Sequence, residues 1–241
     1  MGEFFSWSTV WENFPKVLAK FPVTLEIVIG SFAIGLLLGC VIALLKIHKV
    51  PVLSQLGSIY ISYIRGTPIL VQLFVTYYGI PQVLSSVFHI NVNTWDKMIY
   101  VFIAYGLNQA GFLAEIIRGS ITSVDASQTE AGYSVGLTGM QTFVRIVLPQ
   151  ATRIALPSMG TTFITLFRST ALAYMLGVID IMGKAKNIGV TSFHTLEGYV
   201  DAALIFIVVS IILEQLFNFL NRRLDYEKSH KIRHPKEAVA G

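Results

Sequence analysis

Long runs of apolar residues, separated by shorter polar segments, dominate the pattern of this chain. A helix that crosses a membrane needs about 20 consecutive, mostly apolar residues. Residues 59–64 are also apolar, so an earlier start, before Pro68, is left open for the second of the spans named next. The pattern predicts an all-α membrane protein with five spans: Thr24–Leu45, Pro68–Phe88, Met98–Ile117, Ile154–Val178 and Tyr199–Leu220.

The composition supports this prediction. Of the 241 residues, 54% are hydrophobic and only 13% are charged. Soluble globular domains carry about 25% charged residues. The low charge therefore argues against an ordinary soluble helical protein.

The distribution of lysine and arginine predicts how the spans are oriented, because these residues are enriched on the cytoplasmic side. Five spans place the termini on opposite sides, and we expect the N-terminus outside and the C-terminus inside. Eleven basic residues then lie on inner segments: Lys46, Lys49, Arg118, Arg145, Arg153, Arg222, Arg223, Lys228, Lys231, Arg233 and Lys236. Five lie on outer segments: Lys16, Lys20, Lys97, Lys184 and Lys186. The net charge of +4 then reflects flanks near anionic lipid, and no nucleic-acid partner is needed to explain it.

Three regions follow from these spans: an amphipathic N-terminal segment (1–23), a transmembrane domain (24–220) and a basic cytoplasmic tail (221–241). The N-terminal segment repeats apolar residues at helical spacing, which suits a helix on the membrane surface or one packed on the bundle. In the first span, small residues recur every fourth position and favour close helix packing, within the bundle or with a second copy. These small residues are Ser31, Gly35, Gly39 and Ala43.

The segment between the third and fourth spans, at about residues 119–150, is long for a connection and predicts a helical hairpin. Asp125 is expected to cap its first helix, with Gln128 completing a capping box. Gly136 is expected to end that helix, because glycine adopts the left-handed conformation at little cost.

A second short helix follows in the same segment. Thr138 with Gln141 predicts its cap, and Pro149 is expected to stop it after Leu148. A DNA-reading helix-turn-helix has similar spacing, but its second helix needs several polar side chains for base edges. Here mostly apolar residues surround Gln141 and Arg145, which argues against DNA binding.

Three motifs resemble a known family. Glu130-Ala131-Gly132, Gly136 and Ile146-Val147-Leu148-Pro149 resemble the "EAA" loop of ABC importer permeases, with Gly132 where alanine is usual. Arg65-Gly66-Thr67-Pro68 resembles a signature of polar amino-acid permeases, and the segment with Glu115 and Arg118 resembles a third family motif. The resemblance covers the chain from about Leu18 to Leu220. It implies that the hairpin is a coupling helix that docks on an ATPase through Glu130, Ala131, Gly132, Gly136, Leu137, Ile146, Leu148 and Pro149.

The same resemblance implies the type I importer fold and a set of partners. These are a cytoplasmic ABC ATPase dimer, a second permease (identical or homologous), an extracytoplasmic solute-binding protein and an amino-acid substrate, at a bacterial cytoplasmic membrane. This chain lacks a P-loop: residues 177–185 have one residue too many between the glycines and end in Ala185. We therefore expect a transport subunit that is no enzyme, with no metal or cofactor of its own, and with ATP and Mg²⁺ in the partner.

Charged residues inside spans are costly and suggest function. Arg168 lies deep in the fourth span, in a substrate path or in a structural ion pair, while Glu115 and Arg118 have the spacing of a pair. Glu26, Asp201 and Glu214 lie nearer span ends and are interpreted as interfacial. The expected substrate path comprises Arg168, Ser169, Thr170, Asn108, Gln109, Tyr77 and Tyr78.

Relatives that resemble this chain often have Lys-Asp-Thr where it has Arg168-Ser169-Thr170. Without the acidic residue, a cationic side chain on the substrate has no obvious partner. We therefore expect the substrate to be a neutral polar amino acid, with cystine as one candidate. The alternative functions are an ion-coupled secondary transporter of small polar solutes and a membrane scaffold. Secondary transporters often contain internal repeats, and none is evident among these spans.

Overall fold

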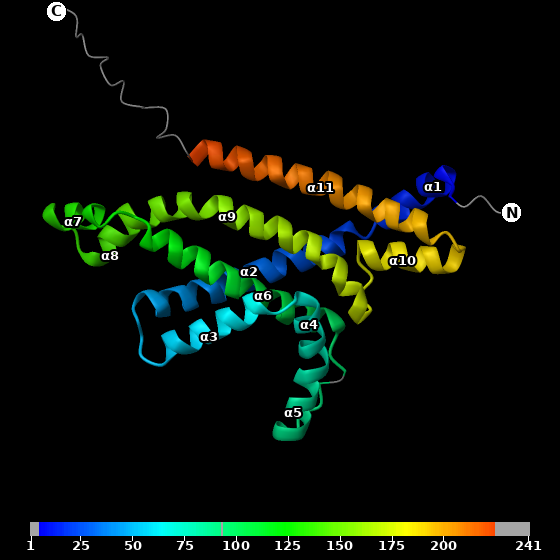
Figure 1. Ribbon diagram of the computed structural model, residues 1–241, viewed down its shortest axis with the longest axis horizontal. Coiled ribbons are helices and arrows are strands. Elements are labelled where there is room, and N and C mark those ends of the chain that lie inside the picture. Colours follow the sequence, from blue (N-terminus) through cyan, green and yellow to red (C-terminus); the bar gives the residue numbers. More distant parts are fainter. Residues whose placement is uncertain (1–4, 93, 225–241) are drawn as a thin grey trace, which may run out of the picture.

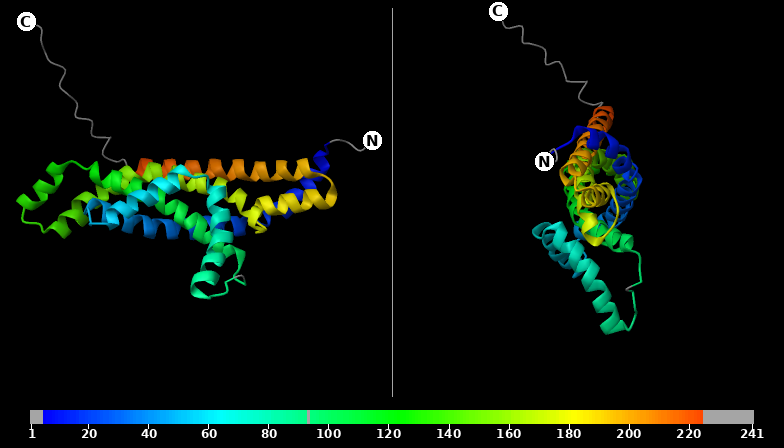
Figure 2. Two further views of the ribbon diagram at one scale, coloured as in Figure 1. Left: turned by 60° about the horizontal axis from the view of Figure 1, so that its bottom comes forward. Right: turned by 90° about the vertical axis from the view of Figure 1, so that its right-hand side faces the viewer.

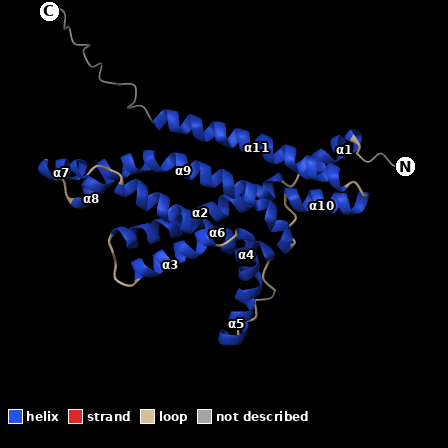
Figure 3. Cartoon of the chain, viewed as in Figure 1, coloured by secondary structure: helices blue, strands red, loops and turns tan. Residues whose placement is uncertain are grey.

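The computed structural model describes residues 5–92 and 94–224 of the chain (Figure 1). These residues form helices and connecting loops, with no strand among them (Figure 3). The α-helices are α1 (Trp7–Leu18), α2 (Phe21–Ile47), α3 (Leu53–Gly66), α4 (Ile69–Phe74), α5 (Ile80–Phe88), α6 (Lys97–Thr122), α7 (Ala126–Ser134), α8 (Gly139–Thr142), α9 (Leu148–Ser169), α10 (Ile181–Ser192) and α11 (Thr195–Leu224). Two π-helical turns, η1 (Val75–Gly79) and η2 (Phe143–Val147), and a 3₁₀ helix, η3 (Thr170–Leu176), link some of them.

The predicted all-α membrane architecture is confirmed. Four helical segments are long and apolar enough to cross a membrane: Phe21–Ile47, Ile69–Phe88, Lys97–Thr122 and Thr195–Arg223. Among the described residues, Gly139–Leu176 and Ile181–Ser192 pass the same test together although they are bent by 48° relative to each other, and they make a fifth span if the bent pair is counted as one. The five apolar runs therefore correspond to the spans of the fold, and the fourth is bent at its end.

A break at Thr67-Pro68 separates α3 from the second span. Thr67 has extended backbone angles (φ −120°, ψ 144°), as expected for a residue that precedes proline. The break frees carbonyl groups at the end of α3, and the buried Gln72 side chain satisfies two of them. The apolar residues 59–64 belong to α3 and not to the later span, and the exposed Arg65 ends that helix. After the break, α4, η1 and α5 project sideways from the long axis of the bundle (Figure 2).

Helices α2 and α6 form the most extensive contact of the described bundle. The whole small-residue stripe of α2 is buried. A Cβ atom built on Gly35 would lie 2.4 Å from Cβ of Gln109, so only glycine permits this approach of the two backbones. The stripe therefore serves packing within one chain.

The two ends of the elongated bundle carry different elements (Figure 1). Helices α7 and α8 lie at one end, while α1 and α10 lie at the other. Helix α1 buries Val10 and Val17 completely but leaves Trp11 68% exposed. It is thus packed on the bundle and still presents an aromatic surface. Of the predicted basic tail, residues 221–224 continue α11, and 225–241 lie outside the described residues.

The prediction that Pro149 stops a helix is wrong. The chain passes from α8 through the π-helical turn η2 directly into α9, where Pro149 occupies one of the first two positions. A proline in the first turn of a helix removes no needed hydrogen bond, because the first N–H groups have no partner within the helix. The π-helical turn supplies the register change that lets the helix continue.

Candidate functional site

The helical hairpin begins with a side-chain cap on α7. A carboxylate oxygen of Asp125 accepts a hydrogen bond from the Ser127 backbone N–H at 2.8 Å. This bond lowers the pKa of Asp125. The predicted capping box with Gln128 is wrong, because the Gln128 side chain instead accepts a hydrogen bond from Gln150, at the start of α9. The cap thus fixes α7, and Gln128 ties it to α9.

The turn of the hairpin confirms the predicted role of Gly136. This residue has φ +82°, in the left-handed region. Its N–H donates to the Tyr133 carbonyl at 3.0 Å, and the Leu137 N–H donates to the Gly132 carbonyl at 3.1 Å. These two bonds form a Schellman motif that closes α7.

The second helix starts with the predicted capping box. The Thr138 hydroxyl accepts from the Gln141 N–H, and the Gln141 side chain accepts from the Thr138 N–H. Because both helix ends are capped, the hairpin is held rigidly while its apolar tip is open to solvent. We define this tip as Tyr133 (54% exposed), Val135 (74%) and Met140 (72%).

The other motif residues surround the apolar tip. Glu130 and Ala131 are exposed on α7, Leu137 is half-buried after the turn, and Ile146 is half-buried on η2. Leu148 and Pro149 are exposed at the start of α9. Exposed apolar side chains and the exposed Glu130 therefore lie on the hairpin at this end of the bundle (Figure 1).

The structure explains why glycine replaces the usual alanine at Gly132. A Cβ atom at this position would lie 2.7 Å from Cγ2 and 2.8 Å from Oγ1 of Thr142. Thr142 is itself buried, so its side chain has little space to move. The two halves of the hairpin thus pack closely because one residue lacks a side chain.

We predict that Gly132→Ala loosens the hairpin and that Thr142→Ala in the same chain restores it. Overpacking of this kind costs about 1–3 kcal/mol. The Thr142 hydroxyl has no hydrogen-bond partner, so its removal sacrifices no hydrogen bond. Limited proteolysis of the loop at residues 134–139 in purified protein measures the effect. Equal cleavage of the wild type and the single variant would contradict the prediction.

The predicted pairing of Glu115 with Arg118 is confirmed and extends to a third residue. Both Nε and Nη2 of Arg118 donate to one carboxylate oxygen of Glu115. Lys46 at the end of α2 donates to the other oxygen at 3.2 Å. The family motif around Glu115 therefore locks α2 to α6 near the end that carries the hairpin.

Two polar residues of the expected substrate path lie in a buried network. The Asn108 amide donates to Gln72 at 2.9 Å, and the Gln109 amide donates to Asn108 at 3.3 Å. Gln72 in turn donates to the Thr67 hydroxyl at 2.7 Å. Asn108 and Gln109 thus anchor the second span to α6.

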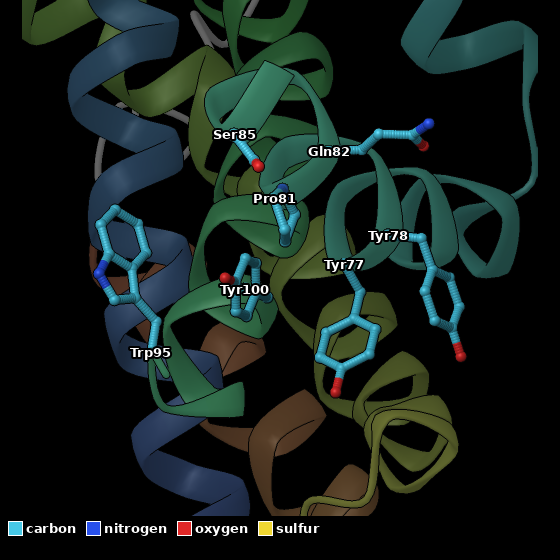
Figure 4. A pocket seen from close by; sticks show the side chains of 7 residues that line it. All are labelled: Tyr77, Tyr78, Pro81, Gln82, Ser85, Trp95 and Tyr100. Carbon is cyan, nitrogen blue, oxygen red and sulfur yellow. The ribbon is translucent and has the colours of Figure 1, made fainter. Parts of the chain in front are cut away.

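Tyr77 and Tyr78 lie in a different place, an aromatic pocket of about 390 Å³ (Figure 4). The Tyr77 ring packs edge-on against Tyr100, with centroids 5.3 Å apart. The Tyr100 hydroxyl donates to the Val92 carbonyl, which fixes its ring. The other lining residues are Pro81, Gln82, Ser85 and Trp95.

Arg168 lies in a third place, a groove of about 320 Å³ between α9 and α11. Its Nε donates to the hydroxyl of Ser210 at 3.1 Å. Ser210 is the sixteenth of the 30 residues of α11, so Arg168 lies level with the middle of that helix. The groove is also lined by Pro157, Gly160, Thr161, Ile164, Thr165, Glu214, Phe217, Asn218 and Asn221.

The residues next to Arg168 serve the backbone of α9 and η3. The Ser169 carbonyl accepts a hydrogen bond from the Tyr105 hydroxyl, and the Thr170 hydroxyl donates to the Phe167 carbonyl at 2.7 Å. Thr170 is fully buried. Within one chain, therefore, the expected path residues are divided among three places, with α11 and α4–α5 on opposite sides of the bundle (Figures 1 and 2).

One acidic residue does not fit its interfacial interpretation. Asp201 is fully buried, and neither of its carboxylate oxygens has a hydrogen-bond partner. Glu214 lies in the groove with Arg168. The sequence interpretation considered only the depth of Glu214 in its span. Glu214 and Ser210 are four residues apart, a spacing that places both on one face of α11.

A family model, described as the inner membrane component of binding-protein-dependent transport systems, matches residues 35–226. The chain belongs to this family. The permease is 39% identical over 224 residues to the L-cystine transport system permease protein TcyL of Bacillus subtilis, covering 93% of each chain. It is 40% identical over 212 residues to the probable amino-acid ABC transporter permease protein PatM of Vibrio harveyi, covering 88% of this chain and 93% of PatM.

The fold of the permease is also similar to a solved structure. A crystal structure of an amino acid ABC transporter with histidines superposes with a TM-score of 0.81 at 29% identity. The match covers 92% of this chain and all of the other. The chain is thus the multi-pass permease subunit of an amino-acid ABC importer, a transport component. Its family implies an ATPase and a solute-binding protein as partners and a place in the bacterial inner membrane.

Proposed function

We propose that this permease imports a neutral polar amino acid, with cystine as the first candidate, and that the hairpin couples transport to separate ATPase subunits. The observation that carries the substrate assignment is the open groove beside Arg168. TcyL, which is named as an L-cystine permease, is similar over almost the whole chain and supports the choice of cystine.

An amino acid brings a carboxylate into a low-dielectric path, where an unpaired charge is costly. A guanidinium group offers a carboxylate two parallel hydrogen bonds. The Nε atom of Arg168 donates a hydrogen bond to Ser210. Among the described residues, Arg168 forms no ion pair. Its terminal nitrogens are therefore the proposed partner of the substrate carboxylate, and the groove volume lies in the range of small-molecule sites.

We also propose a second permease, identical or homologous, facing this groove. Arg168, Glu214 and Asn218 are exposed on the surface of two membrane-spanning helices. Charged side chains in spans normally face the bundle interior or water, because contact with hydrocarbon is costly. A second copy that covers the groove would enclose it as a shared path.

The apolar tip and Glu130 form the proposed docking surface for an ABC ATPase dimer. Capped at both helices, the hairpin presents exposed apolar side chains without needing to reorganise on binding. ATP and Mg²⁺ would bind to the ATPase subunits and not to this chain. An extracytoplasmic solute-binding protein would deliver the amino acid at the end that carries α1 and α10.

Uptake by vesicles that contain the complete transporter tests the substrate assignment. With labelled cystine, glutamine and arginine supplied separately, we expect ATP-dependent uptake of cystine or glutamine to exceed that of arginine. Copurification of an ATPase whose hydrolysis rises with substrate would test the coupling. Arginine as the best substrate would overturn the assignment to neutral amino acids.

A further inference from the structure

Glu214 shares the groove with Arg168 and lies one helical turn from Ser210, the residue that holds the arginine. Glu214 follows Ser210 by four residues on α11, which corresponds to about 6 Å along the helix axis. Along α11, Glu214 lies on the side of Ser210 that leads to the end carrying the hairpin (Figure 1).

The two charges are close without being paired to each other. Among residues 5–92 and 94–224, the ion pairs do not include Arg168 with Glu214, although both side chains line one cavity of about 320 Å³. Opposite charges in a membrane-spanning region normally pair with one another to reduce the cost of burial. Here the Arg168 guanidinium is instead hydrogen-bonded through its Nε to Ser210.

We propose that Glu214 is a specificity-determining residue that binds the ammonium group of the substrate while Arg168 binds its carboxylate. This inference rests on the proposed function and adds the second half of the recognition site. An α-amino acid carries its two charges on one small unit, so a single substrate in the groove can contact both Arg168 and Glu214. Each contact would be a charge-assisted hydrogen bond, which is about twice as strong as a neutral one.

The balance of charge in the groove then determines the substrate class. One arginine and one glutamate among the lining residues match one carboxylate and one ammonium group. A cationic side chain would add a net positive charge for which this lining holds no further carboxylate, whereas the second half of cystine carries one carboxylate and one ammonium group and adds no net charge. The groove therefore favours amino acids whose side chains carry no net charge, even though it contains an acidic residue.

The test compares ligands that differ only in their ammonium groups. Cystine and dithiodipropionate, which is cystine without its ammonium groups, are titrated against the purified permease–ATPase complex. We expect the wild type to prefer cystine by about 10- to 100-fold, the worth of hydrogen bonds to a charged group. In Glu214→Gln this preference should fall below about threefold, because the amide keeps the shape but loses the charge. The matched control is Glu26→Gln, an exposed glutamate on α2 that should keep the wild-type preference.

A second variant covers the case in which Glu214→Gln does not assemble. Asn218→Lys places a cation one turn from Glu214 on the same groove, so that the lysine pairs with the carboxylate and should remove the preference as well. An unchanged preference for cystine in an assembled variant would overturn the role of Glu214. Failure of the proposed function gives a different result, because the wild type would then bind neither cystine nor glutamine.

Discussion

The variants Gly136→Trp and Glu130→Lys are expected to abolish uptake while leaving the permease folded in the membrane. Gly136 has φ +82°, and a residue with a Cβ atom pays roughly 1–2 kcal/mol in this conformation. The indole ring would also project beside the apolar tip. Glu130 is exposed on α7, so Glu130→Lys reverses the charge at this surface position without disturbing a packed core.

Loss of a hot-spot contact costs about 2 kcal/mol or more, which is roughly a 30-fold loss of affinity for the ATPase. Copurification of the ATPase and uptake of labelled substrate measure the effect together. Gly136→Asn is the matched control, because asparagine tolerates the left-handed conformation and is small. Normal copurification together with normal uptake in both variants would show that the hairpin is not the coupling element.

The second large effect is expected for Arg168→Ala, which should reduce uptake roughly 100-fold. Two charge-assisted hydrogen bonds to the substrate carboxylate would be lost, and each is worth about 1.5–3 kcal/mol. Arg168→Lys should have an intermediate effect, because lysine keeps the charge but not the two parallel bonds.

Ser210→Ala provides the control for orientation of the arginine. It removes the partner of Nε and keeps the guanidinium, so we expect a smaller loss of uptake than for Arg168→Ala. Initial rates in vesicles, corrected for the amount of inserted permease, measure all three variants. Wild-type rates in Arg168→Ala would exclude this arginine from the substrate path.

The sequence predicted the spans well because membrane insertion depends on the hydrophobicity of long continuous segments. It also predicted the capped hairpin, since Thr138, Gln141 and Gly136 act through local backbone hydrogen bonds. It failed at Pro149, where the outcome depends on whether the preceding turn is α-helical or π-helical. A π-helical turn has no distinctive local pattern of residues.

The candidate site was only partly predictable, because it depends on which helix faces meet. Arg168 stood out through its depth, but its neighbour Ser210 is 42 residues away in sequence. Glu214 was interpreted as interfacial because it lies near the end of its span. Its place in a groove depends on the packing of α9 against α11. The sequence shows that Asn108 and Gln109 are polar. It does not show that their hydrogen-bond network reaches the break at Thr67-Pro68, because that break lies between two other helices.

The backbone contact between α2 and α6 has a mechanical consequence. Gly35 removes the side chain that would separate the two helices, and Lys46 with Glu115 clamps them near their hairpin end. Helix α6 ends at Thr122, only three residues before the Asp125 cap of the hairpin. We therefore expect that a displacement of the hairpin would move α2 and α6 together as one rigid pair.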